Sequence, residues 1–198
     1  MATEEKLRVS QVLKTAVALF ALMGIVTGVL YPIAVFAAGQ ALFPKQAHGS
    51  LFYAKDGSVA GSELIGQSYT ADRYFWGRPS ATAVKPYNAM ASGGSNYGPT
   101  NQKFISGVFN LTEDLKSAYG SESIPSDLVM ASASGLDPHI SVESALMQAE
   151  RIAKARGVPT DAVKALVTRN IETPLLGVLG KERVNVVLLN RELDEPVI

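Results

Sequence analysis

The most prominent pattern in the chain is a long uncharged stretch near its amino terminus. No charged residue occurs from Thr15 to Pro44, and lysines lie on either side at positions 14 and 45. A helix needs roughly 20 apolar residues to cross the hydrocarbon core of a bilayer, and this stretch is longer. A surface helix would carry a polar face, whereas polar side chains are sparse here before Gln40. The pattern therefore predicts a transmembrane helix and its exit over residues 15–44.

A cleaved signal peptide is the alternative for this stretch, with Val35 and Ala37 as a cleavage site of small residues. The apolar region of a signal peptide is only roughly 7 to 15 residues long, so the length favours a retained anchor. Gly24 and Gly28 form a G-x-x-x-G pair, a spacing that lets a second helix approach closely. The pair is a candidate contact with a partner helix, and a chance occurrence is the alternative.

Basic residues near the two ends of the span predict its orientation. The N-terminal side holds Lys6, Arg8 and Lys14, and the other side holds Lys45 and then Lys55. This small excess predicts a cytoplasmic tail over residues 1–14. Residues 45–198 are then expected to form one extracytoplasmic domain, whose length is normal for a single domain.

The pattern beyond residue 45 mixes short strands with helices. A hairpin is expected over residues 51–60, with its turn at Asp56-Gly57, and residues 67–101 show neither a helical nor a strand period. Helical spacing predicts three helices. They cover residues 104–118, 142–156 after the cap Ser141, and a stretch from Pro159-Thr160 that packs Ala162, Val163, Leu166 and Val167. Residues 127–134 and 183–190 are apolar enough for strands. The sequence predicts an α+β domain on a single membrane anchor.

Composition narrows the function. The 198 residues carry no net charge, so no basic face points to a nucleic-acid partner. The chain has no cysteine, which excludes thiol chemistry and disulfides. Its two histidines, His48 and His139, lie far apart in the sequence and make a weak case for a metal site.

Residues Ser92, Gly93, Gly94 and Ser95 open a glycine-rich stretch that is a candidate nucleotide site. A Walker loop would need lysine after its last glycine, whereas Pro99 follows Gly98 here, and the Rossmann spacing is also absent. The favoured alternative is a rigid polar turn, in which glycine supplies unusual backbone angles and serine bonds the local backbone.

Two further clusters carry candidate chemistry. Ser134, Asp137 and His139 suggest a hydrolase triad, but the G-x-S-x-G elbow is missing, so a turn followed by a cap at Ser141 is favoured. The second cluster consists of Tyr74, Phe75, Trp76 and Arg78. It is a candidate interface with a partner protein. The alternative is that the aromatic side chains belong to the core and that the arginine extends over them.

Taken together, the residues resemble the C subunits of the Kdp potassium-transporting ATPase along nearly the whole chain. The resemblance is carried by blocks in one order: "GVLYP", "GSELIGQSY", "YFWGRPSATA", "YNAMASGGSNYGPTN", "DLVMASASGLDPHIS", "RIAKARGV" and "RVNVVLLN". It implies an inner-membrane complex with a channel-like potassium-binding subunit, a P-type ATPase subunit and a small single-span subunit. ATP, magnesium and potassium are expected at the level of this complex, and this subunit is expected to be non-catalytic, with no cofactor of its own and with lipid around its anchor.

The resemblance implies two alternative roles. In one, the chain supports assembly and tunes potassium uptake by covering the entrance of the channel-like subunit. In the other, Ser92–Ser95 help the ATPase subunit to hold ATP as a catalytic chaperone. The predicted orientation favours the first role, because an extracytoplasmic loop cannot meet cytosolic ATP. An anchored hydrolase that uses Ser134 and His139 is a distant third hypothesis.

Overall fold

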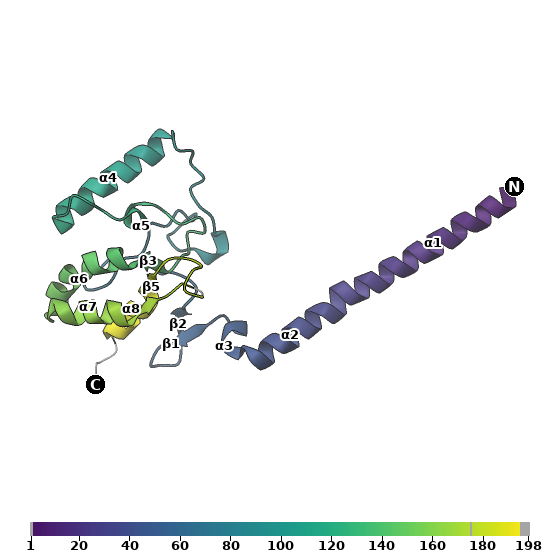
Figure 1. The fold of residues 1–198 in the computed structure, drawn as a ribbon, viewed down its shortest axis with the longest axis horizontal. Helices are drawn as coiled ribbons and strands as arrows, with labels where there is room; N and C mark the ends of the chain where they lie inside the picture. Colours follow the sequence, from purple (N-terminus) through teal and green to yellow (C-terminus); the bar gives the residue numbers. More distant parts are fainter. Residues whose placement is uncertain (1, 175, 195–198) are drawn as a thin grey trace. The chain divides into compact units, whose positions relative to one another are not determined.

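The computed structural model describes residues 2–174 and 176–194. The chain divides into two compact units, Met1–Ser50 and Leu51–Ile198. The first is helical and the second contains both helices and strands (Figure 1). The α+β class with one N-terminal apolar helix is therefore confirmed.

The first unit is a long helix followed by a short turn of helix. Its elements are α1 (Ala2–Ile25), the π-helical turn η1 (Val26–Leu30), α2 (Tyr31–Leu42) and α3 (Pro44–Ala47). Over Arg8–Leu42, a length of 35 residues, the helix is long and apolar enough to cross a membrane. None of its residues is buried over that range, as expected for a helix that lies in lipid.

Pro32 explains the π-helical turn. Proline has no backbone N–H, and its ring clashes with the carbonyl four residues earlier, here that of Gly28. The helix widens just before it, where the Tyr31 N–H donates to the carbonyl of Val26. The Thr27 hydroxyl donates to the carbonyl of Met23 at 2.7 Å, so it has a partner inside the apolar helix.

The second unit holds two small sheets and five α-helices in its described part. Its elements are β1 (Leu51–Tyr53), β2 (Val59–Ser62), the 3-10 turn η2 (Ala89–Ala91), α4 (Gln102–Tyr119), α5 (Ser126–Val129), β3 (His139–Ser141), α6 (Val142–Arg156), α7 (Thr160–Arg169), β4 (Ile171–Glu172), β5 (Arg183–Asn185) and α8 (Val186–Asp194). β1 and β2 form the expected antiparallel hairpin. The other sheet is antiparallel, in the order β3-β5-β4.

The three predicted helices are confirmed, and α4 and α6 have signals at both ends. Asn101 caps α4 by accepting from Lys103 N–H and Phe104 N–H, and Ser141 caps α6 by accepting from Ser144 N–H. α4 and α6 end at Gly120 and Gly157, which adopt the left-handed conformation that glycine tolerates. One detail of α7 is wrong, because Ala162 is exposed rather than packed.

Both additional strands need correction. Residues 127–134 form no strand, because Pro125 precedes the short helix α5 and the segment then turns. The stretch 183–190 is a strand only over Arg183–Asn185. There the Asn185 side chain accepts from Val187 N–H and Leu188 N–H, which begins α8.

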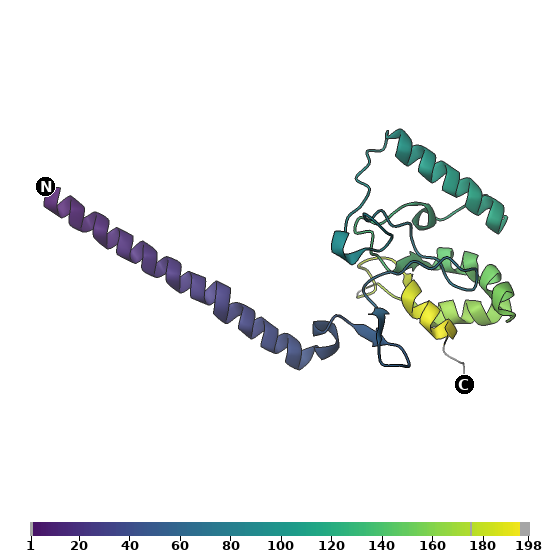
Figure 2. The same cartoon turned by 180° about the vertical axis from the view of Figure 1, so that it is seen from behind.

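The core lies among α6, α7, α8 and the three-stranded sheet. Its buried apolar side chains are Phe75, Ile140, Ala145, Ala149, Ile152, Ala153, Val163, Leu166, Val167, Val184, Val186 and Leu189. In both views α4 lies apart from this helix group (Figure 1, Figure 2). Near its C-terminal end it is joined to α6, where Arg151 donates to the Tyr119 hydroxyl at 3.3 Å.

Candidate functional site

The aromatic segment 72–78 has no regular secondary structure, and side chains satisfy its backbone instead. Asn190 accepts from the Phe75 N–H at 2.7 Å and donates to the Phe75 carbonyl at 2.9 Å. Gln148 repeats this arrangement at Trp76, with distances of 2.7 and 3.1 Å. Because both amides lie in the core, they replace the neighbouring strand that the segment lacks.

Two arginines complete the support of this segment. Arg151 donates to the carbonyls of Asp72 and Tyr74 at 2.6 and 3.0 Å, and its guanidinium lies 3.9 Å from the centre of the Trp76 ring. Arg156 donates to the carbonyl of Arg73 at 2.7 Å. The segment is therefore fixed to α6 and α8 through hydrogen bonds at successive residues.

This geometry bears on the predicted interface residues. Phe75 is fully buried, as in the core alternative. The Tyr74 hydroxyl donates to Asp194 at 2.8 Å, and Arg78 pairs with Asp137 at 3.3 Å. Tyr74, Trp76 and Arg78 remain half-buried, so their contact with a partner stays a prediction. The same holds for Gly24 and Gly28, where an added Cβ would meet nothing within 4 Å.

The glycine-rich stretch Ser92–Ser95 packs against the segment 132–135. The carbonyl of Ser134 accepts from Gly93 N–H at 2.9 Å and from the Ser92 hydroxyl at 3.1 Å. A Cβ added to Gly94 would lie 3.0 Å from the carbonyl oxygen of Ala133. The glycines therefore allow two backbone segments to approach closely.

The segment 132–135 also needs a glycine for this close approach of two backbones. Gly135 has φ +66°, and a Cβ there would lie 2.9 Å from the carbonyl oxygen of Gly93. The Ser80 hydroxyl donates to the Gly135 carbonyl at 2.7 Å and accepts from Tyr87 N–H. These contacts join the stretch Ser92–Ser95 to the rest of the irregular region 67–101.

This packing limits what Ser92–Ser95 can bind. A phosphate cradle needs backbone N–H groups and hydroxyls that point together at the anion. Here the Gly93 N–H and the Ser92 hydroxyl both donate to Ser134. Ser95 is exposed beyond this contact. The assignment of these residues to a nucleotide stays a prediction.

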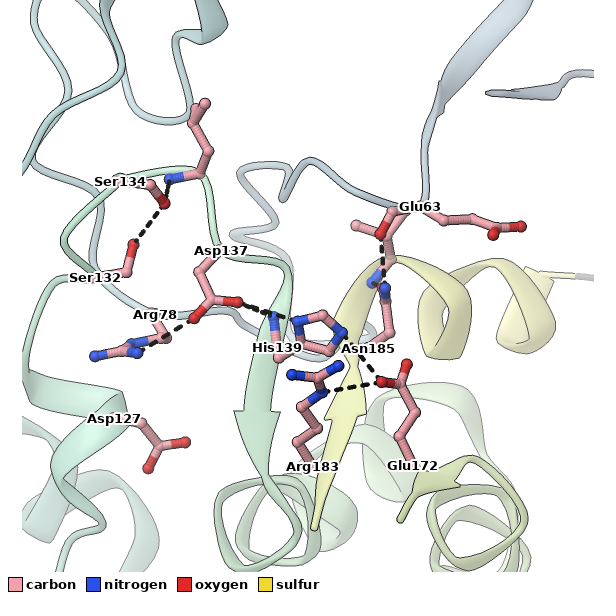
Figure 3. Close-up of polar contacts among 12 residues, drawn as sticks. Glu63, Arg78, Asp127, Ser132, Ser134, Asp137, His139, Glu172, Arg183 and Asn185 are labelled. Atoms are coloured by element: carbon pink, nitrogen blue, oxygen red, sulfur yellow. Dashed lines mark hydrogen bonds and ion pairs between the residues drawn. The ribbon is translucent and has the colours of Figure 1, made fainter. Parts of the chain in front are cut away.

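The serine–histidine cluster is arranged as a turn and a cap. The Ser132 and Ser134 hydroxyls accept from Gly135 N–H and Leu136 N–H, and the Asp137 carboxylate accepts from His139 N–H. Figure 3 shows the His139 ring beside Asp137 and Glu172, with the serines turned to their own loop. A triad would need a serine hydroxyl against the ring. The arrangement is that of the turn-and-cap alternative.

Five charged or ionisable side chains form a row across the sheet, with His139 at its centre (Figure 3). They are Arg78, Asp137, His139, Glu172 and Arg183. Asp137 and Glu172 lie 3.1 and 3.4 Å from the two ring nitrogens. Arg78 contacts the carboxylate of Asp137, and Arg183 contacts that of Glu172. Burial alone would raise the pKa of Asp137, but hydrogen bonds from His139 and the charge of Arg78 outweigh it and lower that pKa.

Burial also affects the phenol of Tyr87, which lies under this region. Its hydroxyl donates to the carbonyl of Arg78 at 2.6 Å. Burial and the nearby Asp137 raise its pKa to about 12. The side chain fills space that two glycines leave open, because a Cβ on Gly66 would lie 2.4 Å from the ring and one on Gly77 would lie 2.5 Å from the hydroxyl oxygen.

Sequence reasoning missed Gln148, Asn190 and the carboxylate of Glu172. A weak signal exists for the first two, since each is a polar residue on an otherwise apolar helix face. Their partners lie 72 and 115 residues away, so spacing alone cannot identify the contact. Glu172 joins the row because it lies opposite Arg183 in the sheet.

Comparison with known proteins identifies the family. Residues 13–195 match the family model described as "K+-transporting ATPase, c chain". The chain is similar to the potassium-transporting ATPase KdpC subunit of Polaromonas naphthalenivorans, with 51% identity over 92% of this chain and 94% of that one. It is similar to the same subunit of Variovorax paradoxus, with 50% identity over 93% and 96%. For Geobacter metallireducens the identity is 48% over 92% and 96%. The chain belongs to the KdpC family of potassium-transporting ATPase subunits.

Proposed function

We propose that the chain is a non-catalytic subunit of an ATP-driven potassium importer in the inner membrane. Its partners are the channel-like, P-type ATPase and small single-span subunits, which supply the sites for potassium, ATP and magnesium. Residues 45–198 lie outside the membrane, support assembly and tune potassium uptake by covering the entrance of the channel-like subunit.

The observation that carries this proposal is the packing of Ser92–Ser95. Two donors that a phosphate would need are used by the carbonyl of Ser134. Family membership and the apolar helix support a single-span subunit in a transport complex. Orientation adds a further reason, because a polar domain of this size does not cross the bilayer during a transport cycle.

A stop codon after Ser50 tests this function, because it keeps the first compact unit and removes the second. The expected result is poor recovery of the complex, or a complex with weakened apparent affinity for potassium. The affinity for ATP at saturating potassium should be unchanged in whatever complex remains. Normal assembly together with normal potassium affinity would contradict the proposal.

The second candidate is the catalytic chaperone, in which Ser92–Ser95 raise the ATP affinity of the ATPase subunit. The exposure of Ser95 is the observation that favours it. In that case the truncation would lower ATP affinity while potassium affinity and assembly stayed normal. The two functions therefore give opposite results in one experiment.

A further inference from the structure

A cavity of about 670 Å³ lies between the C-terminal turns of α6 and α8 and one side of α7. These three helices lie together in both views of the fold (Figure 1, Figure 2). Sites for small molecules have volumes of roughly 300–1,000 Å³ and combine an apolar lining with a few polar groups. The cavity has the size of such a site, and its lining determines what it can bind.

The lining of the cavity is mainly aliphatic. Val163 and Leu166 of α7 are its buried part. Ala155, Ala162 and Ala165 also line it, and all three are exposed. Their short side chains leave the space open, and Ala162 is the residue that helical spacing predicted to pack. Because aliphatic surface in contact with water costs free energy in proportion to its area, the aliphatic part of a ligand would be stabilised here.

Arginines dominate the polar part of the cavity. Arg73, Arg156 and Arg169 line it, whereas Glu192 is the one carboxylate among the lining residues that the structure describes. Glu192 contacts Arg169 at 3.1 Å. Asp194 contacts Arg156 at 2.9 Å and Arg73 at 3.9 Å. Three arginines are thus opposed by two carboxylates, so this group of side chains carries one positive charge in excess.

Arg73 is the arginine best placed to offer that charge to a ligand. Its side chain is 55% exposed, its ion pair with Asp194 is long, and it lies 5.7 Å from the centre of the Tyr74 ring. Arg156, by contrast, is 10% exposed and is held by the carbonyls of Arg73 and Leu193. An arginine binds a carboxylate through two parallel hydrogen bonds, which an exposed guanidinium can supply.

We propose that this cavity binds a short-chain aliphatic monocarboxylate. The aliphatic chain lies against Val163 and Leu166, and the carboxylate pairs with Arg73 beside Arg169. A single negative charge matches the excess of one positive charge, whereas a phosphate group carries about −1.5 to −2 charges at neutral pH. This inference goes beyond the proposed function and does not depend on it.

The first test uses hexanoate as the probe and the full chain in lipid nanodiscs. Ligand-observed NMR, after subtraction of the signal from empty nanodiscs, should give a dissociation constant of roughly 1 mM for a ligand of this size. Hexanol lacks the charge and acetate lacks the aliphatic chain, so each should bind at least about tenfold more weakly. Absence of hexanoate binding would overturn the proposal, as would equal binding of hexanol or acetate.

Substitution of the exposed arginines tests the charged part of the cavity. Arg73→Gln with Arg169→Gln should weaken hexanoate binding by roughly tenfold, because both donors to the carboxylate are lost. Lys164→Gln removes a positive charge from an exposed position of α7 outside the lining, and it should stay within about twofold of the original chain. Equal effects of the two changes would overturn the assignment of the carboxylate to these arginines.

Filling the cavity tests its aliphatic part. Ala162→Phe places a ring in the hollow from an exposed position, so it should abolish hexanoate binding without entering the core. The matched control is Ala118→Phe, at an exposed position of α4 outside this cavity. Normal binding by Ala162→Phe, with thermal unfolding like that of the control, would overturn the proposal. None of these results bears on truncation after Ser50, so this inference and the proposed function can fail separately.

Discussion

At the scale of single residues, Gln148 and Asn190 act in place of a strand. Each is a buried amide that bonds both backbone groups of one aromatic residue. Both amides point at the backbone of segment 72–78, which lies in the first part of the irregular region 67–101. The position of that segment therefore depends in part on two side chains.

Asn190→Leu tests this dependence. The substitution leaves the Phe75 N–H and carbonyl buried without partners, and each such group costs roughly 1–3 kcal/mol. The free energy of unfolding should fall by about 2–4 kcal/mol in chemical denaturation of the full chain in detergent. Asn110→Leu, on the exposed face of α4, is the matched control and should change it by less than about 0.5 kcal/mol. Equal effects of the two variants would contradict this role of Asn190.

Substitutions of Gly93 and Gly94 test whether this stretch serves backbone packing or nucleotide binding. An added Cβ on Gly94 meets the carbonyl oxygen of Ala133 at 3.0 Å, whereas one on Gly93 meets nothing within 4 Å. Gly94→Ala should therefore destabilise the domain by about 1–2 kcal/mol, and Gly93→Ala by less than about 0.5 kcal/mol. The apparent ATP affinity of the complex should be unchanged in both. A weaker ATP affinity in both variants, with normal stability, would support the chaperone role.

Asp137 should make the stability of the folded domain depend on pH. Because its pKa is lowered in the folded state, the ionised carboxylate contributes stability at pH values above its unfolded pKa. That contribution is lost as the pH falls through the lowered folded pKa. Asp137→Asn should therefore be less stable than the original chain at neutral pH, and the difference should shrink under acid conditions. If the difference in stability between the variant and the original chain stayed constant with pH, the charge of Asp137 would not contribute to stability.

At the scale of elements, local signals predicted the helices well. α4 and α6 combine a capping side chain, an apolar face and a terminal glycine, all of which lie within one stretch of sequence. The predicted strand at 127–134 and the second part of the one at 183–190 are wrong for a physical reason. Short apolar runs suit a buried strand or a buried helix equally, and Asn185 decides the second case by capping α8.

Two variants of Asn185 test whether its side chain begins α8 as a cap. Asn185→Ala removes the cap and the donor to the Glu63 carbonyl, which lies 2.8 Å away. It should cost roughly 1–2 kcal/mol of stability. Asn185→Asp keeps an acceptor for the helix N–H groups and loses the donor, so it should be intermediate. If the aspartate variant is no better than alanine in thermal unfolding, the cap is not what Asn185 contributes.

At the scale of the whole molecule, the sequence predicted the anchor, the fold class and the family. Composition alone identifies the candidate span, because the stretch from Thr15 to Pro44 carries no charged residue and is flanked by Lys14 and Lys45. The site was predicted only in part. Its turns follow from Gly93, Gly94 and Asp137, whereas the supports Gln148 and Asn190 depend on contacts between distant segments.

The central claim is that the second unit lies outside the membrane and away from cytosolic ATP. The chain has no cysteine, and Ser95 is exposed, so Ser95→Cys introduces one reactive thiol into the stretch in question. An impermeant maleimide should label this thiol in intact spheroplasts that carry the active complex. Labelling only after the membrane is opened would place the stretch in the cytoplasm and contradict the account.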